Sequence, residues 1–178
     1  MDKTTENTQV KTTQKAKKPM QIHDGVQVKV KSTYYGKLFY QNPRTGDSTE
    51  WNDAGEVQIM TMGDLRAMKA GQVKFFKDHW IMVLGVADYE DCNATCEDLH
   101  KALMITQYYT NFIEPTDFNA ICSWKPEEIA ERVSMMSAGA KENLVVALNT
   151  FIKNGTLDSR KKIKAFEDAL GCNLYEEE

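Results

Sequence analysis

The segment from residue 26 to about residue 86 alternates apolar and polar side chains with the period of a β-strand. Val26, Val28 and Val30 are separated by Gln27 and Lys29, and this pattern is typical of a strand with one buried face. Further apolar runs, bounded by turn residues, predict strands near residues 38–40, 49–51, 57–60 and 81–85. We therefore predict a small antiparallel sheet of four or five strands.

One helix is predicted inside this sheet region. The stretch Thr61-Met62-Gly63-Asp64 is a candidate N-cap region, and Leu65 and Met68 then lie on one helical face. The helical segment is expected to continue as far as Trp80. The prediction is thus one helix inserted between two strands.

From about residue 88 the apolar positions recur with the period of a helix. Asn93 or Thr95 is the candidate N-cap of a first helix. Pro126, which two glutamates follow, predicts the start of another, because proline fits the first turn and acidic groups complement the helix dipole there. Two more helices are expected, over about 140–153 and over about 159–170.

Together these patterns predict an α+β chain. An extended N-terminal arm covers residues 1–25, and a small antiparallel β-sheet domain follows over residues 26–87. A C-terminal helical cluster then forms a second domain over residues 88–178.

The predicted arm has a composition that does not support folding by itself. Residues 1–20 contain no aromatic residue and carry a net charge near +3, which leaves about −7 for the rest of the chain. Such a segment buries too little apolar surface to offset its ordering entropy. We expect the arm to become ordered only on a partner, with its lysines as contacts: Lys3, Lys11, Lys15, Lys17 and Lys18.

The overall composition excludes some classes of protein. The 22 Lys and Arg residues against 26 Asp and Glu residues give a net charge of −4, whereas binding to a nucleic acid backbone needs clustered positive charge. No apolar run reaches the roughly 18 residues of a membrane span, and no secretory signal is visible. Four cysteines in 178 residues predict reduced thiols in a cytosol-like compartment.

Cys92, Cys96 and His100 are the most suggestive set of reactive or metal-ligating residues. Their spacing puts them on one helical face, and with His79 or Cys122 they would make a zinc site. However, the row rises about 12 Å along the helix, which is too long for one tetrahedral ion. We therefore expect buried cysteines, no metal, no cofactor and no enzyme, and keep a zinc protein or a small Cys/His enzyme as an alternative.

A basic cluster lies in the last predicted helix. Arg160, Lys161 and Lys164 share one face, which suits contact with nucleic acid or with an acidic protein. A solvated face opposite the apolar residues explains the same pattern, and we favour it. A DNA-binding or regulatory module that uses this face and the arm is a further alternative, with weak contact to DNA.

Aromatic residues are concentrated in the predicted sheet domain. Most are expected to build its core, because a small sheet needs large side chains. Some of them are also candidates for a protein-binding surface, since Tyr and Trp are favoured at interfaces. The candidates are Tyr34, Tyr35, Tyr40 and Trp51.

Scattered Gly, Trp and Phe positions carry a resemblance to a known group of proteins. In the sheet region they are Gly36-Lys37-Leu38-Phe39-Tyr40, Thr45-Gly46, Trp51, Gly55-Glu56, Met62 with Leu65, and Phe75-Phe76 with Trp80. In the helical region they are Lys141, Leu157-Asp158-Ser159, Ile163 and Leu170. Over roughly residues 26–172 the chain resembles small, largely uncharacterised structural proteins of tailed bacteriophages. No catalytic motif comes with this resemblance.

The resemblance implies a structural protein of the virion. We therefore expect a non-enzymatic subunit that binds other virion proteins, of the capsid-decoration or head–tail connector type, in a homo- or hetero-oligomeric assembly. The expected location is the virion, and no contact with a membrane is expected. Zinc analysis, DNA binding and incorporation into particles separate this function from its alternatives.

Overall fold

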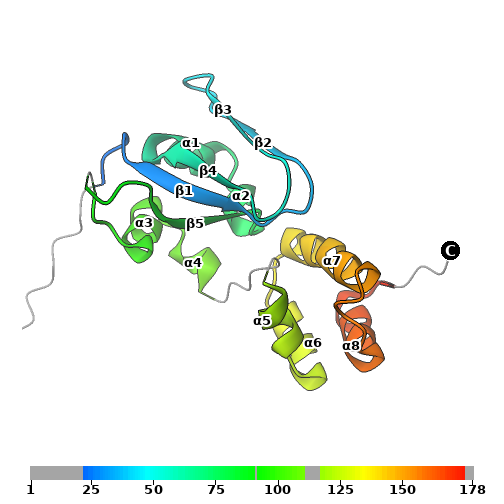
Figure 1. The fold of residues 1–178 in the computed structure, drawn as a ribbon. Coiled ribbons are helices and arrows are strands. Elements are labelled where there is room, and N and C mark those ends of the chain that lie inside the picture. The colour runs from blue at the N-terminus through cyan, green and yellow to red at the C-terminus, as the bar shows by residue number, and fades with distance from the viewer. Residues whose placement is uncertain (1–21, 91, 111–116, 175–178) are drawn as a thin grey trace, which may run out of the picture.

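The structure, a computed structural model, describes residues 22–90, 92–110 and 117–174. It confirms the predicted α+β class, with a small antiparallel sheet and several helices (Figure 1). The five lysines of the predicted arm lie outside the described residues, so their expected role stays a prediction.

The strands fall into two separate sheets. They are β1 (Gln27–Ser32), β2 (Leu38–Gln41), β3 (Ser48–Trp51), β4 (Val57–Thr61) and β5 (Ile81–Val86). β1 is the centre of a three-stranded antiparallel sheet in the order β4–β1–β5, while β2 and β3 form a hairpin of their own. The expected single sheet is wrong, because β4 and β5 occupy both edges of β1 and leave no edge for β2.

Short helices follow the strands in the first part of the chain. They are α1 (Met62–Gly71), α2 (Lys74–Lys77), α3 (Cys96–Leu103) and α4 (Thr106–Tyr109). Within the predicted N-cap region, Thr61 caps α1 in a capping box with Asp64, and Thr95, one of the two candidates, caps α3 in a capping box with Asp98. The single inserted helix is in fact two, since the chain leaves the helical conformation at Gln72.

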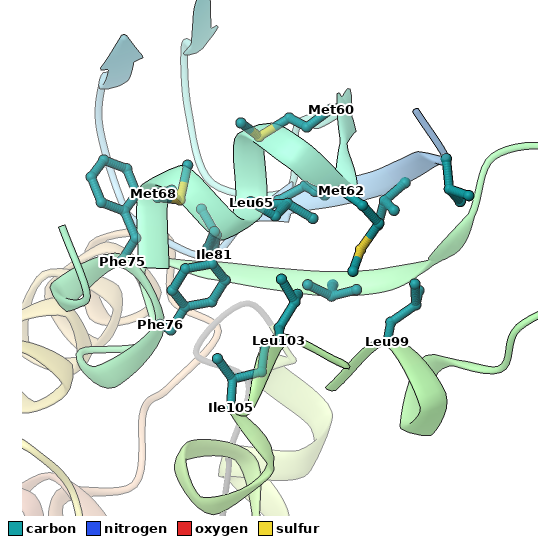
Figure 2. Packing of buried hydrophobic residues seen from close by; sticks show 14 of the residues in the cluster. Met60, Met62, Leu65, Met68, Phe75, Phe76, Ile81, Leu99, Leu103 and Ile105 are labelled. Carbon is teal, nitrogen blue, oxygen red and sulfur yellow. The ribbon is translucent and has the colours of Figure 1, made fainter. Parts of the chain in front are cut away.

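One face of the three-stranded sheet is covered by α1 and α3. Val28 and Val30 of β1 point to this face and are fully buried. Figure 2 shows Met62 and Leu65 of α1 above this core and Leu103 of α3 below it. The opposite face of the sheet carries no helix among the described residues, and side chains such as Lys29 and Ile59 are exposed there (Figure 1).

The remaining helices pack around a second core. They are α5 (Phe118–Ser123), α6 (Pro126–Ser134), α7 (Ala138–Lys153) and α8 (Arg160–Leu170), and they gather on one side of the molecule (Figure 1). Pro126 begins α6 as predicted, and Gly171 ends α8 with a φ of +70°. The core of this part includes Trp124, Leu148 and Phe166.

The two cores do not divide where the sequence suggested. Leu99 and Leu103 of α3 and Ile105 pack in the sheet core, although the helical domain was predicted to begin at residue 88. Ile22 is buried in the same core, so the predicted arm does not extend to residue 25. We use "sheet unit" for the described residues up to Thr110 and "helical unit" for residues 117–174.

Candidate functional site

The open face of the three-stranded sheet carries two rows of side chains across its strands. In the first row, Lys31 of β1 lies between Val57 of β4 and Met82 of β5. In the second row, Lys29 lies opposite Ile59 of β4, and a bulge follows on the β5 side. Because directly paired residues share one face of a sheet, these side chains form one surface.

This surface is apolar on both outer strands. Ile59 is 56% exposed, and Val57 and Leu84 are exposed as well. Tyr89 is exposed next to the bulge, with its hydroxyl 3.6 Å from the position that a Cβ on Gly85 would take. The other exposed large apolar side chains of the described residues are spread over β2, α7 and two helix ends: Phe39, Met104, Met135 and Val146. The sheet face is therefore where exposed apolar side chains gather.

The charge of the open face is positive. Lys29 is exposed at its centre, with Lys31 in the neighbouring row of the same strand. A second copy of the same face would set lysine against lysine, which like charges disfavour. A segment with a carboxylate between apolar side chains complements both the charge and the apolar margins.

The outer edge of β5 is closed by side chains of the helices that follow it. The Tyr109 hydroxyl donates a hydrogen bond to the Ile81 carbonyl at 2.6 Å, and the Cys96 thiol donates to the Val83 carbonyl at 3.1 Å. An edge strand with unpaired carbonyls invites the addition of another strand. Cys96 and Tyr109 occupy two of these carbonyls, so this part of the edge is not available for the addition of a strand.

Cys96 and His100 lie close together, with the Cys96 sulfur 3.6 Å from Nε2 of His100. Burial raises the pKa of the Cys96 thiol, and burial lowers the pKa of His100. Both shifts favour the neutral thiol and the neutral imidazole, whereas a cysteine nucleophile needs its thiolate. Burial therefore acts against a charged thiolate–imidazolium pair at this place.

Two other members of the predicted zinc set, Cys92 and His79, come from outside α3. Cys92 precedes the Thr95 N-cap, so it is not on the helix with Cys96 and His100. The Tyr109 ring stacks on His100 at 4.8 Å and meets the ring of His79 at 5.6 Å. Within the ranges that the structure describes, no three His, Cys, Asp or Glu residues are grouped to hold a metal ion. The Cys122 side chain lies outside the description.

The predicted aromatic surface is wrong for two of its four residues. Tyr40 and Trp51 are 2% and 0% exposed, because the β2–β3 hairpin turns these side chains into the sheet core. The indole Nε1 of Trp51 donates a hydrogen bond to the Val30 carbonyl at 3.1 Å. Tyr34 and Tyr35 are half-buried and make edge contacts with Trp80 and Phe151.

The basic residues of α8 are exposed, but two of them have acidic neighbours. Nζ of Lys161 lies 3.3 Å from a Glu127 carboxylate oxygen, and Nζ of Lys164 lies 2.7 Å from a carboxylate oxygen of Asp168. Arg160 lies at the start of the same helix. These pairs weaken the field that the cluster would present to a phosphate backbone.

The open sheet face was missed at the sequence level, although the sequence holds a signal for it. Ile59 and Met60 are adjacent in one strand, and adjacent strand residues point to opposite faces. Two neighbouring apolar residues therefore indicate a strand that is apolar on both sides. The 56% exposure of Ile59 in the folded chain shows that this side of β4 has no cover.

The described residues form surface hollows at the turn between α1 and α2 and at the end of α8. A hollow of about 380 Å³ lies at the turn between α1 and α2, and Lys74 is its one charged lining residue. No helix in the described ranges has the length and apolarity to cross a bilayer. The chain matches no protein-family model, no curated protein and no solved structure.

Proposed function

We propose that this chain is a non-enzymatic structural subunit of a bacteriophage particle, located in the virion. It binds another subunit through the open face of its three-stranded sheet and holds a neighbour with its N-terminal arm. The exposed apolar face of the sheet supports a binding function, and the resemblance to phage proteins supports a location in the virion.

The partner on the open face is an amphipathic acidic segment of another virion protein. The apolar margins at Ile59, Val57 and Leu84 supply the area that is buried on docking. Lys29 at the centre pairs with a carboxylate of the partner. The blocked carbonyls of Ile81 and Val83 direct this partner to the face of the sheet.

The alternatives have less support. The Cys96–His100 pair is held in its neutral form, which argues against a cysteine enzyme. The α8 lysines have carboxylate neighbours, which argues against a DNA site there. The sheet face is thus the feature of the described residues that best fits a binding function.

The test measures the chain in purified particles by quantitative mass spectrometry. We expect a fixed number of copies per particle, and absence from the particles would contradict the proposal. Ile59→Glu should lower incorporation at least about tenfold by placing a charge on the apolar margin. Val146→Glu is the matched control, because Val146 is 47% exposed on α7, away from the sheet face.

Two further measurements separate the arm from the face and DNA from protein. Deletion of residues 2–18 should abolish incorporation while circular dichroism shows a folded chain. Normal incorporation of this variant would remove the arm from the mechanism. DNA binding should be weak and non-specific at about 0.15 M salt, since the lysines of the arm allow few phosphate contacts. Sub-micromolar, sequence-dependent binding to DNA would instead favour the DNA-binding alternative.

A further inference from the structure

The sheet unit and the helical unit meet at a polar seam. The buried apolar side chains of the two units form two clusters with no shared member. Between them, Asn143 of α7 is only 2% exposed and reaches the loop after β1. The aromatic contact at this seam is the edge-on approach of Tyr35 and Phe151, with ring centroids 6.4 Å apart.

Asn143 connects the units through backbone groups. Its Oδ1 accepts a hydrogen bond from the Tyr35 amide at 3.0 Å, and its Nδ2 donates to the Thr33 carbonyl. The Thr33 hydroxyl in turn donates to the carbonyl of His79, which ties this loop to the corner before β5. A single amide side chain thus makes two hydrogen bonds across the seam.

The first turn of α7 lies directly against Asp78 of the sheet unit. A Cβ added at Gly139 would lie 2.6 Å from Cβ and Cγ of Asp78. Such a distance is far below van der Waals contact, so the helix approaches this closely only with glycine at position 139. The Asp78 carboxylate is buried beside a helix N-terminus, where a negative charge is favoured.

We propose that Asn143, Gly139 and Asp78 form a polar latch that opens while both cores stay folded. When the latch opens, water takes over the hydrogen bonds of Asn143 and hydrates Asp78. The net loss of free energy is therefore small. Neither apolar cluster is exposed by this step, because neither extends across the seam. The helical unit can thereby reorient relative to the sheet unit. This inference does not depend on the proposed function.

The experiment combines amide hydrogen exchange with small-angle X-ray scattering on the full chain carrying Gly139→Ala. This variant keeps Asn143 and its partners, so faster exchange at the Tyr35 amide reports opening and not the loss of its acceptor. We expect exchange at Tyr35 to become at least about tenfold faster and the radius of gyration to increase. The amides of Val30 and Leu148, one in each core, should keep their protection.

Matched variants make the result specific. Gly71→Ala is the control, because Gly71 also lies on a helix and has open space around it. Asp78→Gly in the Gly139→Ala background removes the atoms that the new methyl group meets, so it should restore slow exchange at Tyr35. Failure of this rescue would overturn the assignment of the latch to these residues.

Asn143→Ala provides a second and independent way to open the latch. It should increase the radius of gyration, while the amides of both cores keep their protection from exchange. Asn149→Ala on the same helix should leave the radius of gyration unchanged. The proposal is overturned if Gly139→Ala leaves the exchange at Tyr35 unchanged. It is equally overturned if both variants lose protection throughout the chain, since the seam would then belong to one cooperative core.

Discussion

The sheet unit and the helical unit satisfy their backbone in different ways. In the sheet unit, some strand carbonyl groups accept hydrogen bonds from side chains. Tyr109 and Cys96 donate to the carbonyls of Ile81 and Val83 at the edge of β5. Trp51 of the β2–β3 hairpin donates to the Val30 carbonyl of β1. Helices pair their own backbone groups, and the helical core is built from apolar side chains such as Leu148 and Phe166. Polar side chains in the sheet unit therefore satisfy backbone carbonyl groups, whereas in the helical core the backbone satisfies its own groups.

This difference gives a structural role to residues that the sequence suggested for catalysis or metal binding. Cys92, Cys96 and His100 suggested a catalytic or metal-binding set, yet the Cys96 thiol, together with the Tyr109 hydroxyl, closes the edge of β5. The division into two cores also predicts that damage to one core stays within its unit. The predictions below test that separation, from the largest effect to the smallest.

The largest effect is expected for Trp51→Ala in the sheet core. The substitution leaves a cavity and removes the donor to the Val30 carbonyl, so we expect a loss of about 4–5 kcal/mol in the unfolding free energy of this unit. Amide exchange should show lost protection in β1 and intact protection in α7. The corresponding variant in the helical core is Phe166→Ala, which should lower the unfolding free energy of that unit by about 3 kcal/mol. Here amide protection should be lost in α7 and kept in β1.

Two controls make this comparison decisive. Phe39→Ala, on the exposed side of β2, should change the unfolding free energy by less than about 0.5 kcal/mol. Trp51→Phe keeps one six-membered ring but loses the second ring and the N–H donor, and should cost about 2 kcal/mol, less than Trp51→Ala. Loss of protection in both units after Trp51→Ala alone would contradict the separation of the cores.

A smaller effect is expected at the tip of the β2–β3 hairpin. Gly46 has a φ of +81°, and its amide donates to the Asn42 carbonyl at 2.9 Å, so the turn needs a conformation that β-branched residues avoid. Gly46→Val should lower the unfolding free energy of the sheet unit by about 1–2 kcal/mol in a urea titration. Gly71→Ala, with no positive φ, should not lower it. An unchanged midpoint for Gly46→Val would show that the hairpin tolerates the strain.

Local signals in the sequence were sufficient for the elements that begin and end within a few residues. The Thr61 capping box, Pro126 at the start of α6 and Gly171 at the end of α8 all act over one helical turn. The α+β class follows from such signals together with the change in period near residue 88.

The relations that the sequence did not reveal are all long-range. The residues next to Trp51 in the sequence do not indicate that its indole bonds to Val30. Likewise, the residues next to Leu99 do not indicate that it packs in the sheet core. Hairpin burial, the open face and the seam depend on which elements meet, and side-chain periodicity carries no information on that. Gly139 shows this clearly, because its partner is 61 residues away in the sequence, at Asp78.

The smallest effect concerns the dependence of stability on pH near the closed edge of β5. Burial lowers the pKa of His100 below the usual value of about 6.5, so the folded chain binds fewer protons than the unfolded chain between these two pKa values. Stability from this group is therefore present at neutral pH and decreases as the pH falls below about 6.5. His79 acts in the same direction, because burial lowers its pKa too.

His100→Phe removes this titration and keeps a ring to stack on Tyr109. We expect the melting temperature of this variant to fall less than that of the unaltered chain between pH 7.5 and pH 5.5. A residual slope should persist because His79 still titrates, and carboxylates contribute little above about pH 5. The same slope in both proteins would show that His100 is not desolvated by the β5 edge. A steeper slope in His100→Phe would contradict this prediction, because it would mean that the folded chain stabilises the charged imidazolium and raises the pKa of His100.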